Sequence, residues 1–269
     1  MSTRHLDFKL FLTPEGQLNL FRKEITDNEL PQICAFINKN PQVKSLNLNG
    51  DSSLTSNHLT EDGCKILAKN LLQNKNFVAL HLNNNEVGNR GIEYLAQLKQ
   101  LTLLDIAATG IDEHGVFHLR NLKKLVSLDV SDNLFGSIGI QAMVGNLRQL
   151  RILYVKNCDL TAEDAKAIST MPHLIILVIS DNKLGDAGAH YIATMKKLCF
   201  LDARRNGFSN AGKDIIDNMQ FSSLDASETA KLEEALPEET FAKTASLGKL
   251  VLEKISHQVE RKQKSRELK

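Results

Sequence analysis

The sequence predicts an α/β solenoid, a horseshoe in which short parallel strands form a concave sheet and helices cover the convex side. Two observations predict this fold. One apolar frame recurs along the chain at a nearly constant period, and each copy is followed by apolar residues at helical spacing. The composition agrees, since 42% of the 269 residues are hydrophobic although the chain has no Trp and three Tyr. A core of repeated aliphatic side chains explains this sequence better than an irregular globular core.

The recurring frame reads L-x-x-L-x-L-x-x-N-x-L, and segment 125–135 shows it most clearly. Its second leucine, the anchor, is spaced by 24, 24, 25, 24 and 24 residues in six copies: Leu80, Leu104, Leu128, Leu153, Leu177 and Leu201. An earlier copy has its anchor at Leu46 and its turn position at Asp51. The longer step to the next anchor indicates a loop inserted over 52–58, and a fading copy at 221–226 closes the series. Seven frames in register predict a repeat array.

The second half of each unit predicts a short helix. A glycine is followed by apolar residues four and then three positions apart, as in Gly91, Leu95 and Leu98. Segment 161–164 has the chemistry of a capping box, and Thr60 occupies the same place in an earlier unit. A glycine inside a helix costs ~1 kcal/mol relative to alanine, so its recurrence indicates close packing or a strained helix start. A structural role is expected for the asparagines at the turn position, which Cys158 replaces once: Asn85, Asn133, Asn182 and Asn206.

This strand–turn–helix unit resembles the leucine-rich repeat, and over residues 43–226 the chain is similar to the ribonuclease-inhibitor-like branch of that family. The resemblance implies a leucine-rich-repeat solenoid with stacked leucines inside, a parallel concave sheet and convex helices. The short period, the lone repeat domain and the Asn- and Lys-rich composition also resemble the leucine-rich-repeat effectors of intracellular bacteria such as Legionella. That second resemblance implies a virulence protein, active in host–pathogen interaction inside a eukaryotic cell.

The two ends of the array are expected to be caps, because a stack exposes its first and last cores. Residues 1–42 are predicted to form an N-terminal cap: a hairpin around the turn at 13–16, with 8–12 as its first strand, then a degenerate repeat helix at 27–40. Residues 227–269 are predicted to form a helical C-terminal cap or tail. This segment could cap the last repeat, extend freely or fold across the concave face.

The outward-pointing side chains of the expected strands form the candidate binding face. Five of them on three consecutive strands are apolar, and neighbouring strands lie about 4.8 Å apart, so these side chains form one patch. Charged residues border the patch, and an apolar centre with a charged rim is typical of a protein interface. The predicted protein-binding residues are Leu103, Asp105, Asp129, Ile152, Tyr154, Lys156, Ile176, Val178, Phe200, Asp202 and Arg204.

Three occupants of this patch stay open from sequence alone. An external partner protein could bind there, the chain's own C-terminal helices could cover it, or it could form a crystal or dimer contact. His81 lies on the same predicted face. As a single exposed imidazole, it is expected to make a polar contact rather than to act in catalysis.

No enzymatic activity, cofactor or metal site is expected. The sequence has no G-x-S-x-G, P-loop, H-E-x-x-H or deaminase pattern. Its four cysteines have no C-x-x-C spacing and are expected to be reduced and buried. A formal charge of +1 favours neither a nucleic acid nor an anionic membrane as partner. Without a signal peptide or a membrane span near the start, a cytoplasmic monomer is expected.

These observations predict a non-catalytic protein–protein interaction module that binds a partner on its concave face, in the role of a bacterial effector translocated into the host cytosol. One alternative is an endogenous cytosolic scaffold or inhibitor of the ribonuclease-inhibitor type. Another is the substrate-recognition part of a ubiquitin-ligase complex. A ligase domain within the chain itself is not expected, since about 42 residues follow the repeats and none of them is Cys.

Overall fold

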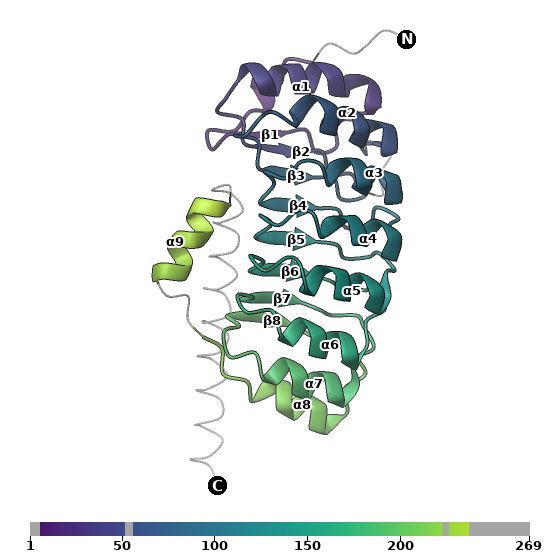
Figure 1. The fold of residues 1–269 in the computed structure, drawn as a ribbon, viewed down its shortest axis with the longest axis vertical. Helices are drawn as coiled ribbons and strands as arrows, with labels where there is room; N and C mark the ends of the chain where they lie inside the picture. The colour runs from purple at the N-terminus through teal and green to yellow at the C-terminus, as the bar shows by residue number, and fades with distance from the viewer. Residues whose placement is uncertain (1–5, 52–55, 223–225, 237–269) are drawn as a thin grey trace.

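The structure is a computed structural model, and it describes residues 6–51, 56–222 and 226–236. Its centre is one open sheet of eight parallel strands, which follow one another in chain order (Figure 1). Each strand is three residues long: β1 Gln17–Asn19, β2 Ser45–Asn47, β3 Ala79–His81, β4 Leu103–Asp105, β5 Ser127–Asp129, β6 Ile152–Tyr154, β7 Ile176–Val178 and β8 Phe200–Asp202. The predicted parallel sheet is confirmed.

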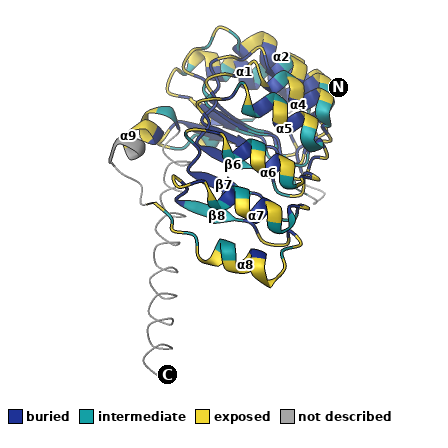
Figure 2. Cartoon of the chain, turned by 60° about the horizontal axis from the view of Figure 1, so that its bottom comes forward, coloured by how far each residue is buried: buried dark blue, intermediate teal, exposed yellow. Residues whose placement is uncertain are grey.

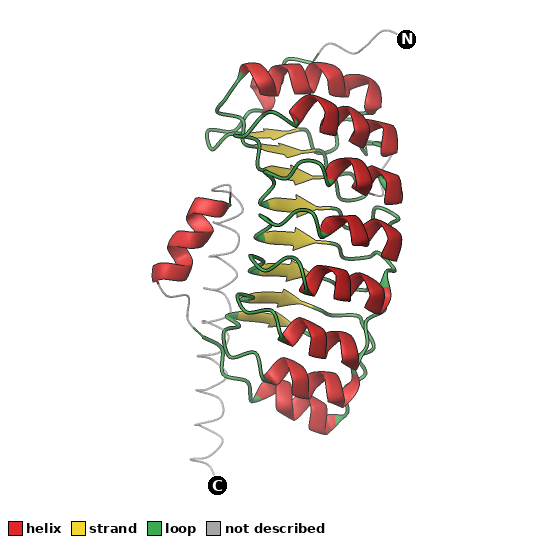
Figure 3. Ribbon diagram, in the orientation of Figure 1, coloured by secondary structure: helices red, strands yellow, loops and turns green. Residues whose placement is uncertain are grey.

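Helices alternate with the strands, and α1 to α8 stack along one side of the sheet (Figure 3). The helices are η1 Phe8–Phe11 and η2 Asp27–Glu29, both of 3-10 type, and α1 Leu30–Lys39, α2 Glu61–Leu71, α3 Gly88–Leu95, α4 Glu113–Leu119, α5 Gly136–Val144, α6 Ala162–Ser169, α7 Gly185–Ala193, α8 Asn210–Asp217 and α9 Ala226–Ala235. Figure 2 shows buried strands and helices that carry exposed residues on their outer side. Within the described parts of the chain, no helix is long and apolar enough to cross a membrane.

The anchor leucines form the spine of the core. Parallel pairing places each of them beside the anchor of the next coil, from Leu18 and Leu46 in the first pair to Leu177 and Leu201 in the last. The anchors are fully buried except Leu201, which belongs to the last coil and is half-buried. Full burial of a leucine stabilises the fold by about 1.5–3 kcal/mol relative to exposure. A single coil cannot bury its leucine, and stacking does so by placing a neighbouring coil on each side.

Asparagine side chains tie consecutive coils together at the turn after each strand. Asn133 Nδ2 donates to the carbonyl oxygens of Ile106 at 2.9 Å and Val130 at 3.1 Å. Its Oδ1 accepts from the backbone N–H of Thr109 at 3.1 Å and of Ile111 at 3.2 Å. Both the amide and the backbone groups are buried, where an unmade hydrogen bond is costly. Asn85 and Asn182 make the same donor and acceptor bonds, and Asn206 donates from its Nδ2 to neighbouring carbonyl oxygens. The structural role predicted for these asparagines is confirmed.

The assignment of Asp51 to the turn position of the second coil is wrong, because Asn57 takes that position. Asn57 Nδ2 donates to the carbonyls of Leu20 at 2.9 Å and Leu48 at 3.0 Å, and its Oδ1 accepts from the N–H of Ile25 at 2.9 Å. The physical reason is that a neutral amide both donates and accepts, whereas a carboxylate accepts only. The inserted loop therefore ends by restoring the repeat chemistry.

Close packing explains the recurrent glycines on the convex side. A Cβ on Gly188 would lie 2.5 Å from Leu184 Cβ, and a Cβ on Gly91 would lie 2.6 Å from Val87 Cγ1. Ordinary carbon–carbon contacts lie at about 3.5–4.0 Å, so a side chain at these positions would force the helix away from its own turn. The capping box at Thr161 is confirmed, since its backbone N–H donates to Asp164 Oδ2 at 2.8 Å.

The N-terminal cap contains a strand and helix of the same kind as the repeats, but its first arm is not a strand. Phe8–Phe11 forms the 3-10 helix η1, whose N-cap residue Asp7 accepts from the N–H of Lys9 at 3.1 Å. Only Leu12 forms an antiparallel bridge, with Leu18. The predicted hairpin is therefore reduced to one bridge, because residues 8–11 turn in the capped 3-10 helix instead of extending beside β1.

The C-terminal segment leaves the stack after α8. Among the described residues the sheet ends at β8, so the fading copy at 221–226 adds no ninth strand, and Ala226 begins α9. Figure 1 shows α9 on the side of the sheet opposite to α1–α8. Of the three courses open to this segment, its described part takes the one across the concave face. Residues 237–269, the rest of the predicted C-terminal cap, lie outside the described residues.

Candidate protein-binding face

The concave face is built from the first and third residues of each strand. The middle residue points into the core, so the residues on either side of it point outward. Parallel pairing aligns these outward residues in two rows. The apolar row, of first residues, consists of Ala79, Leu103, Ile152, Ile176 and Phe200, with Ser127 interrupting it. The polar row, of third residues, consists of Asn47, His81, Asp105, Asp129, Tyr154, Val178 and Asp202.

Helix α9 packs on the apolar row. Leu232 and Leu236 are 0% and 5% exposed, and they form one cluster with all five residues of the row. Leu103, Ile152 and Ile176, which were expected to face a partner, are buried in that cluster. The prediction that these three side chains are exposed is therefore wrong. Their burial favours the second of the three occupants, the chain's own C-terminal segment. The physical reason is that large aliphatic side chains left in water cost free energy, which a helix on top of them recovers.

The residue before several of the strands also packs against this helix, and the sequence prediction missed it. Val126, Ile175 and Cys199 are buried in the same cluster as Leu232. Thr102 Oγ1 donates to the carbonyl oxygen of Ala235, close to the end of α9. A signal was present in the sequence: the position two before the anchor is Val, Ile or Cys in these coils, where a solvent-facing position would be polar.

Hydrogen bonds hold the carboxyls of the polar row, across coils for Asp105 and within its own coil for Asp129. Asp105 Oδ2 accepts from Asn49 Nδ2 at 3.1 Å and lies 3.7 Å from His81 Nδ1. Asp129 Oδ1 accepts from the N–H of Ser131 at 2.9 Å. Asp105 and Asp129 lie side by side in the sheet register. The row therefore presents two neighbouring carboxyls at the middle of the face.

Burial and the neighbouring Asp105 raise the pKa of Asp129 to about 7, against 3.8 ordinarily. Both causes disfavour the charged carboxylate, since one removes water from it and the other adds a like charge. Burial, then Asp129 and Asp105, raise the pKa of the adjacent Tyr154 to about 12. Asp129 is therefore only partly ionised near neutral pH, and a positive group placed beside it would favour the charged carboxylate. Among the described residues, no three His, Cys, Asp or Glu side chains are grouped to hold a metal ion.

The charged residues predicted to border the patch form ion pairs, Arg204 with Asp202 of the same face and Lys156 with Asp132. Arg204 bonds Asp202 through two nitrogens, each at 2.8 Å, and the Nζ of Lys156 lies 3.8 Å from Asp132 Oδ2. Arg204 is exposed, whereas Lys156 and Asp202 are half-buried. Exposed ion pairs of this kind contribute about 0–1 kcal/mol, so these groups remain available to other charges. Three further predicted residues, Tyr154, Val178 and Phe200, are half-buried on the same face.

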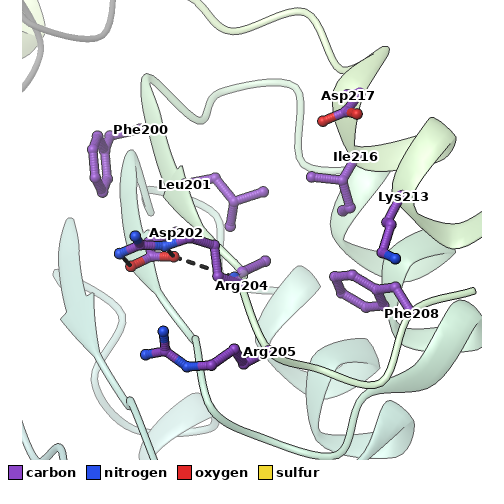
Figure 4. Close-up of a pocket in the computed structure, with 10 residues that line it drawn as sticks. Phe200, Leu201, Asp202, Arg204, Arg205, Phe208, Lys213, Ile216 and Asp217 are labelled. Carbon is purple, nitrogen blue, oxygen red and sulfur yellow. Dashed lines mark hydrogen bonds and ion pairs between the residues drawn. The ribbon is translucent and has the colours of Figure 1, made fainter. Parts of the chain in front are cut away.

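A hollow of about 530 Å³ lies at the end of the sheet, next to β8 (Figure 4). Leu201 points into it, toward Ile216 of α8, whereas Phe200 points to the other side of the strand. Phe208 and Lys213 line the same hollow. Leu201 is only half-buried because β8 pairs on one side alone, with β7. This hollow is where a further coil would stack. Phe200, Asp202 and Arg204 also line it, so it joins the end of the repeat array to the binding face.

The comparisons with known proteins agree with the repeat. Three segments of the chain, residues 73–96, 121–144 and 170–193, match the family model described as "Leucine Rich repeat". A ribonuclease inhibitor from Sus scrofa is 30% identical over 197 residues, which are 63% of this chain and 43% of that protein. The matched segments each contain the end of one coil and the strand and helix of the next, so sequence and structure identify the same unit.

Two solved structures are similar to this chain. An internalin from Listeria monocytogenes has a TM-score of 0.50 at 19% identity, over 69% of this chain and 48% of that one. The leucine-rich-repeat ectodomain of the Arabidopsis thaliana receptor kinase GASSHO1/SCHENGEN3, in complex with CASPARIAN STRIP INTEGRITY FACTOR 2, has a TM-score of 0.40 at 20% identity, over 68% and 27%. The internalin likeness concerns the fold alone. The chain spans less than half of the length of each of these three proteins.

Proposed function

We propose that this solenoid, three of whose coils match the leucine-rich repeat, is a non-catalytic module that binds a partner protein on its concave face. The observation that carries this proposal is the apolar row beside the two carboxyls of the polar row. Outward positions of a sheet in water are polar unless something packs on them. Here they are aliphatic and aromatic over several strands, and a helix is already seated there. A surface of this chemistry fits a protein better than a small ligand.

The likeness to known proteins supports binding as the activity. Repeat solenoids offer an extended, rigid concave surface and are widely used for protein recognition. The name of the porcine relative describes an inhibitor of an enzyme, which is a protein-binding activity. For the present chain this remains a proposal, since the relative is more than twice as long as the matched segment.

Affinity capture with matched variants tests the proposal. The concave variant is Tyr154→Ala with Phe200→Ala, two half-buried residues of the face. The control is Leu134→Asp, because Leu134 is 67% exposed and belongs to neither row. We expect the concave variant to lose a specific partner that both the wild type and the control retain, with all three proteins equally folded by circular dichroism. If all three capture the same proteins in equal amount, the concave face is not the binding site.

The cellular setting of this binding is the finer part of the proposal. We propose a bacterial effector that acts in the cytosol of a eukaryotic host, with an endogenous scaffold or inhibitor of the ribonuclease-inhibitor type as the alternative. The likeness to a ribonuclease inhibitor favours the endogenous inhibitor, whereas the short repeat favours the effector. A translocation reporter fused to the chain separates them: delivery into host cells supports the effector, and absence of delivery leaves the endogenous role. Ligase subunits among the captured partners would instead indicate substrate recognition for a ubiquitin-ligase complex.

A further inference from the structure

Helix α9 shows which shape the apolar row accepts. Its contacts with the row come from Leu232, Ala235 and Leu236, at positions i, i+3 and i+4. This spacing places three side chains on one side of a helix, so the row receives the apolar edge of an amphipathic helix. Figure 1 shows that α9 lies obliquely across the series of strands rather than parallel to any one of them.

The row is longer than the helix that occupies it. From β3 to β8 it crosses five strand spacings, which span ~24 Å at about 4.8 Å each. Helix α9 has ten residues and is therefore ~15 Å long at 1.5 Å per residue. A helix of about 16 residues would match the whole row.

The charge of α9 does not match the face beneath it. Between Ala226 and Ala235 the helix has three Glu and one Lys. The polar row contributes Asp105 and Asp129, and no Lys or Arg pairs with either carboxyl among the described residues. First and third residues of a strand lie ~6.6 Å apart, so a long side chain of a helix on the apolar row reaches the polar row. The acidic residues of α9 thus offer these carboxyls no ion pair, whereas the Lys or Arg side chains of a basic helix would pair with them.

From these observations we infer that the concave face binds a basic amphipathic helix of a partner protein, and that α9 is an internal occupant of the same place which the partner displaces. The partner helix presents large aliphatic residues at i, i+3, i+4 and i+7 to the apolar row and Lys or Arg to Asp105 and Asp129. This inference rests on the proposed function and names the class of partner. Bound α9 lowers the apparent affinity for the partner, because the free face is available only when α9 has left it.

Direct binding of two synthetic helices tests the class of partner. The probes are fluorescein-labelled 16-residue peptides with the same leucine pattern, one with Lys and one with Glu at the flanking positions. We expect the full-length chain to bind the basic peptide about tenfold or more tightly than the acidic one. In the double variant Asp105→Asn with Asp129→Asn, this preference should fall to about twofold or less, since the amides keep the shape without the charge. Equal affinity for the two peptides in the wild type overturns the inference.

A comparison of the cross-linked with the unlinked protein tests whether α9 occupies the same place. Thr102 bonds the backbone of Ala235, so Thr102→Cys with Ala235→Cys can be joined by a short bis-maleimide. Cys199 packs beneath α9 and is replaced by Ser in both forms. The other native cysteines interfere little, because they are buried and burial raises the pKa of Cys34 and Cys158 to about 12. The cross-linked protein should bind the basic peptide about tenfold or more weakly than the same protein without the linker. The variant Leu232→Asp with Leu236→Asp, which unseats α9, should bind it more tightly than the wild type.

The outcomes separate this inference from the proposed function. Unchanged binding after cross-linking means that α9 does not compete, and the displacement is then wrong. Failure of both peptides to bind any form of the chain means that a helix is not the partner. The capture experiment with Tyr154→Ala and Phe200→Ala uses no peptide. If that variant loses a partner while the peptide experiments fail, the proposed function still holds and only this inference is wrong.

Discussion

At the scale of single residues, the asparagine at the turn position stabilises the array through several buried hydrogen bonds. One amide satisfies backbone groups from two coils at once, and all of them are buried. Where the asparagine is missing, the replacement does part of the same work: Cys158 Sγ lies 3.4 Å from the carbonyl of Val130, and Thr109 Oγ1 donates to Ile106 at 2.7 Å. Hydrogen-bond satisfaction, rather than residue identity, is therefore what the position requires.

Replacing Asn182 with alanine should lower the free energy of unfolding by ~2–4 kcal/mol, because several buried backbone groups lose their partner. Asn182 Nδ2 donates to Val155 and Ile179, and its Oδ1 accepts from the N–H of Leu160. Urea denaturation followed by circular dichroism measures the change. Asn76→Ala is the matched control, since Asn76 is exposed, and it should stay within ~0.5 kcal/mol of the wild type. Equal effects of the two substitutions would contradict the role of the amide.

The raised pKa of Asp129 gives a pH dependence with a definite sign. The folded value of about 7 lies above the ordinary 3.8, so the folded state holds a proton that the unfolded state has released between these values. The stabilising contribution is complete below about pH 4 and is lost as the pH rises to about 7. Asp129→Asn removes the charge and should be ~2 kcal/mol more stable than the wild type at pH 8, with little difference at pH 3.5. Denaturation at the two pH values measures this, with the exposed Asp214→Asn as control.

At the scale of elements, each coil combines a strand of three residues with a helix. In several coils a glycine in the first turns of the helix allows it to lie close to its own turn, whereas α1 and α6 contain no glycine. In α7 this position is Gly188, above Leu184, and in α3 it is Gly91, above Val87. Helix propensity opposes glycine at these places, and packing decides in its favour.

The contrast between two glycines checks this explanation. Gly188→Ala places a methyl group 2.5 Å from Leu184 Cβ, and we expect a loss of ~2 kcal/mol of stability or more from overpacking. Gly145, at the end of α5, has its nearest contact at 3.7 Å, with the carbonyl of Gln141. Gly145→Ala should therefore be neutral or stabilising by up to ~1 kcal/mol. Thermal unfolding of both variants measures the difference, and a stabilising Gly188→Ala would refute the packing argument.

At the scale of the whole molecule, the solenoid is a one-dimensional stack in which each coil contacts its neighbours. Stability is then unequal along the chain, since an end coil has one neighbour and a central coil has two. The structure shows this inequality at β8, where Leu201 is half-buried next to an open hollow, while Leu128 is fully buried in the middle.

Leu128→Ala should destabilise the whole array by ~3 kcal/mol or more, because it leaves a cavity between two coils. Leu201→Ala should cost ~1–2 kcal/mol and act mainly on the last coil, since its side chain already has one open side. Hydrogen exchange read by coil measures the extent of each effect. The one-dimensional description would fail if both variants raised exchange uniformly from β1 to β8.

The sequence by itself determined the repeat, the parallel sheet and the two rows of the concave face. It could do so because a buried position must be apolar wherever it recurs, and a fixed period places every such position in register. The same logic explains its local errors. The period assigns the turn position to Asp51, whereas hydrogen bonding selects Asn57 after an insertion, and the capping chemistry of Asp7 makes η1 a 3-10 helix.

Only the tertiary structure decided what covers the apolar row. The sequence identifies Ile152 and Ile176 as outward and apolar, and this holds in the structure, but it also leaves an external partner as one of their possible occupants. Leu232 and Leu236 reach them from more than fifty residues further along the chain. No local pattern specifies such a contact, because an amphipathic helix reduces its exposed apolar area equally well on any matching surface. Shape and proximity in the folded array select the concave face, and they make α9 the feature a partner has to displace.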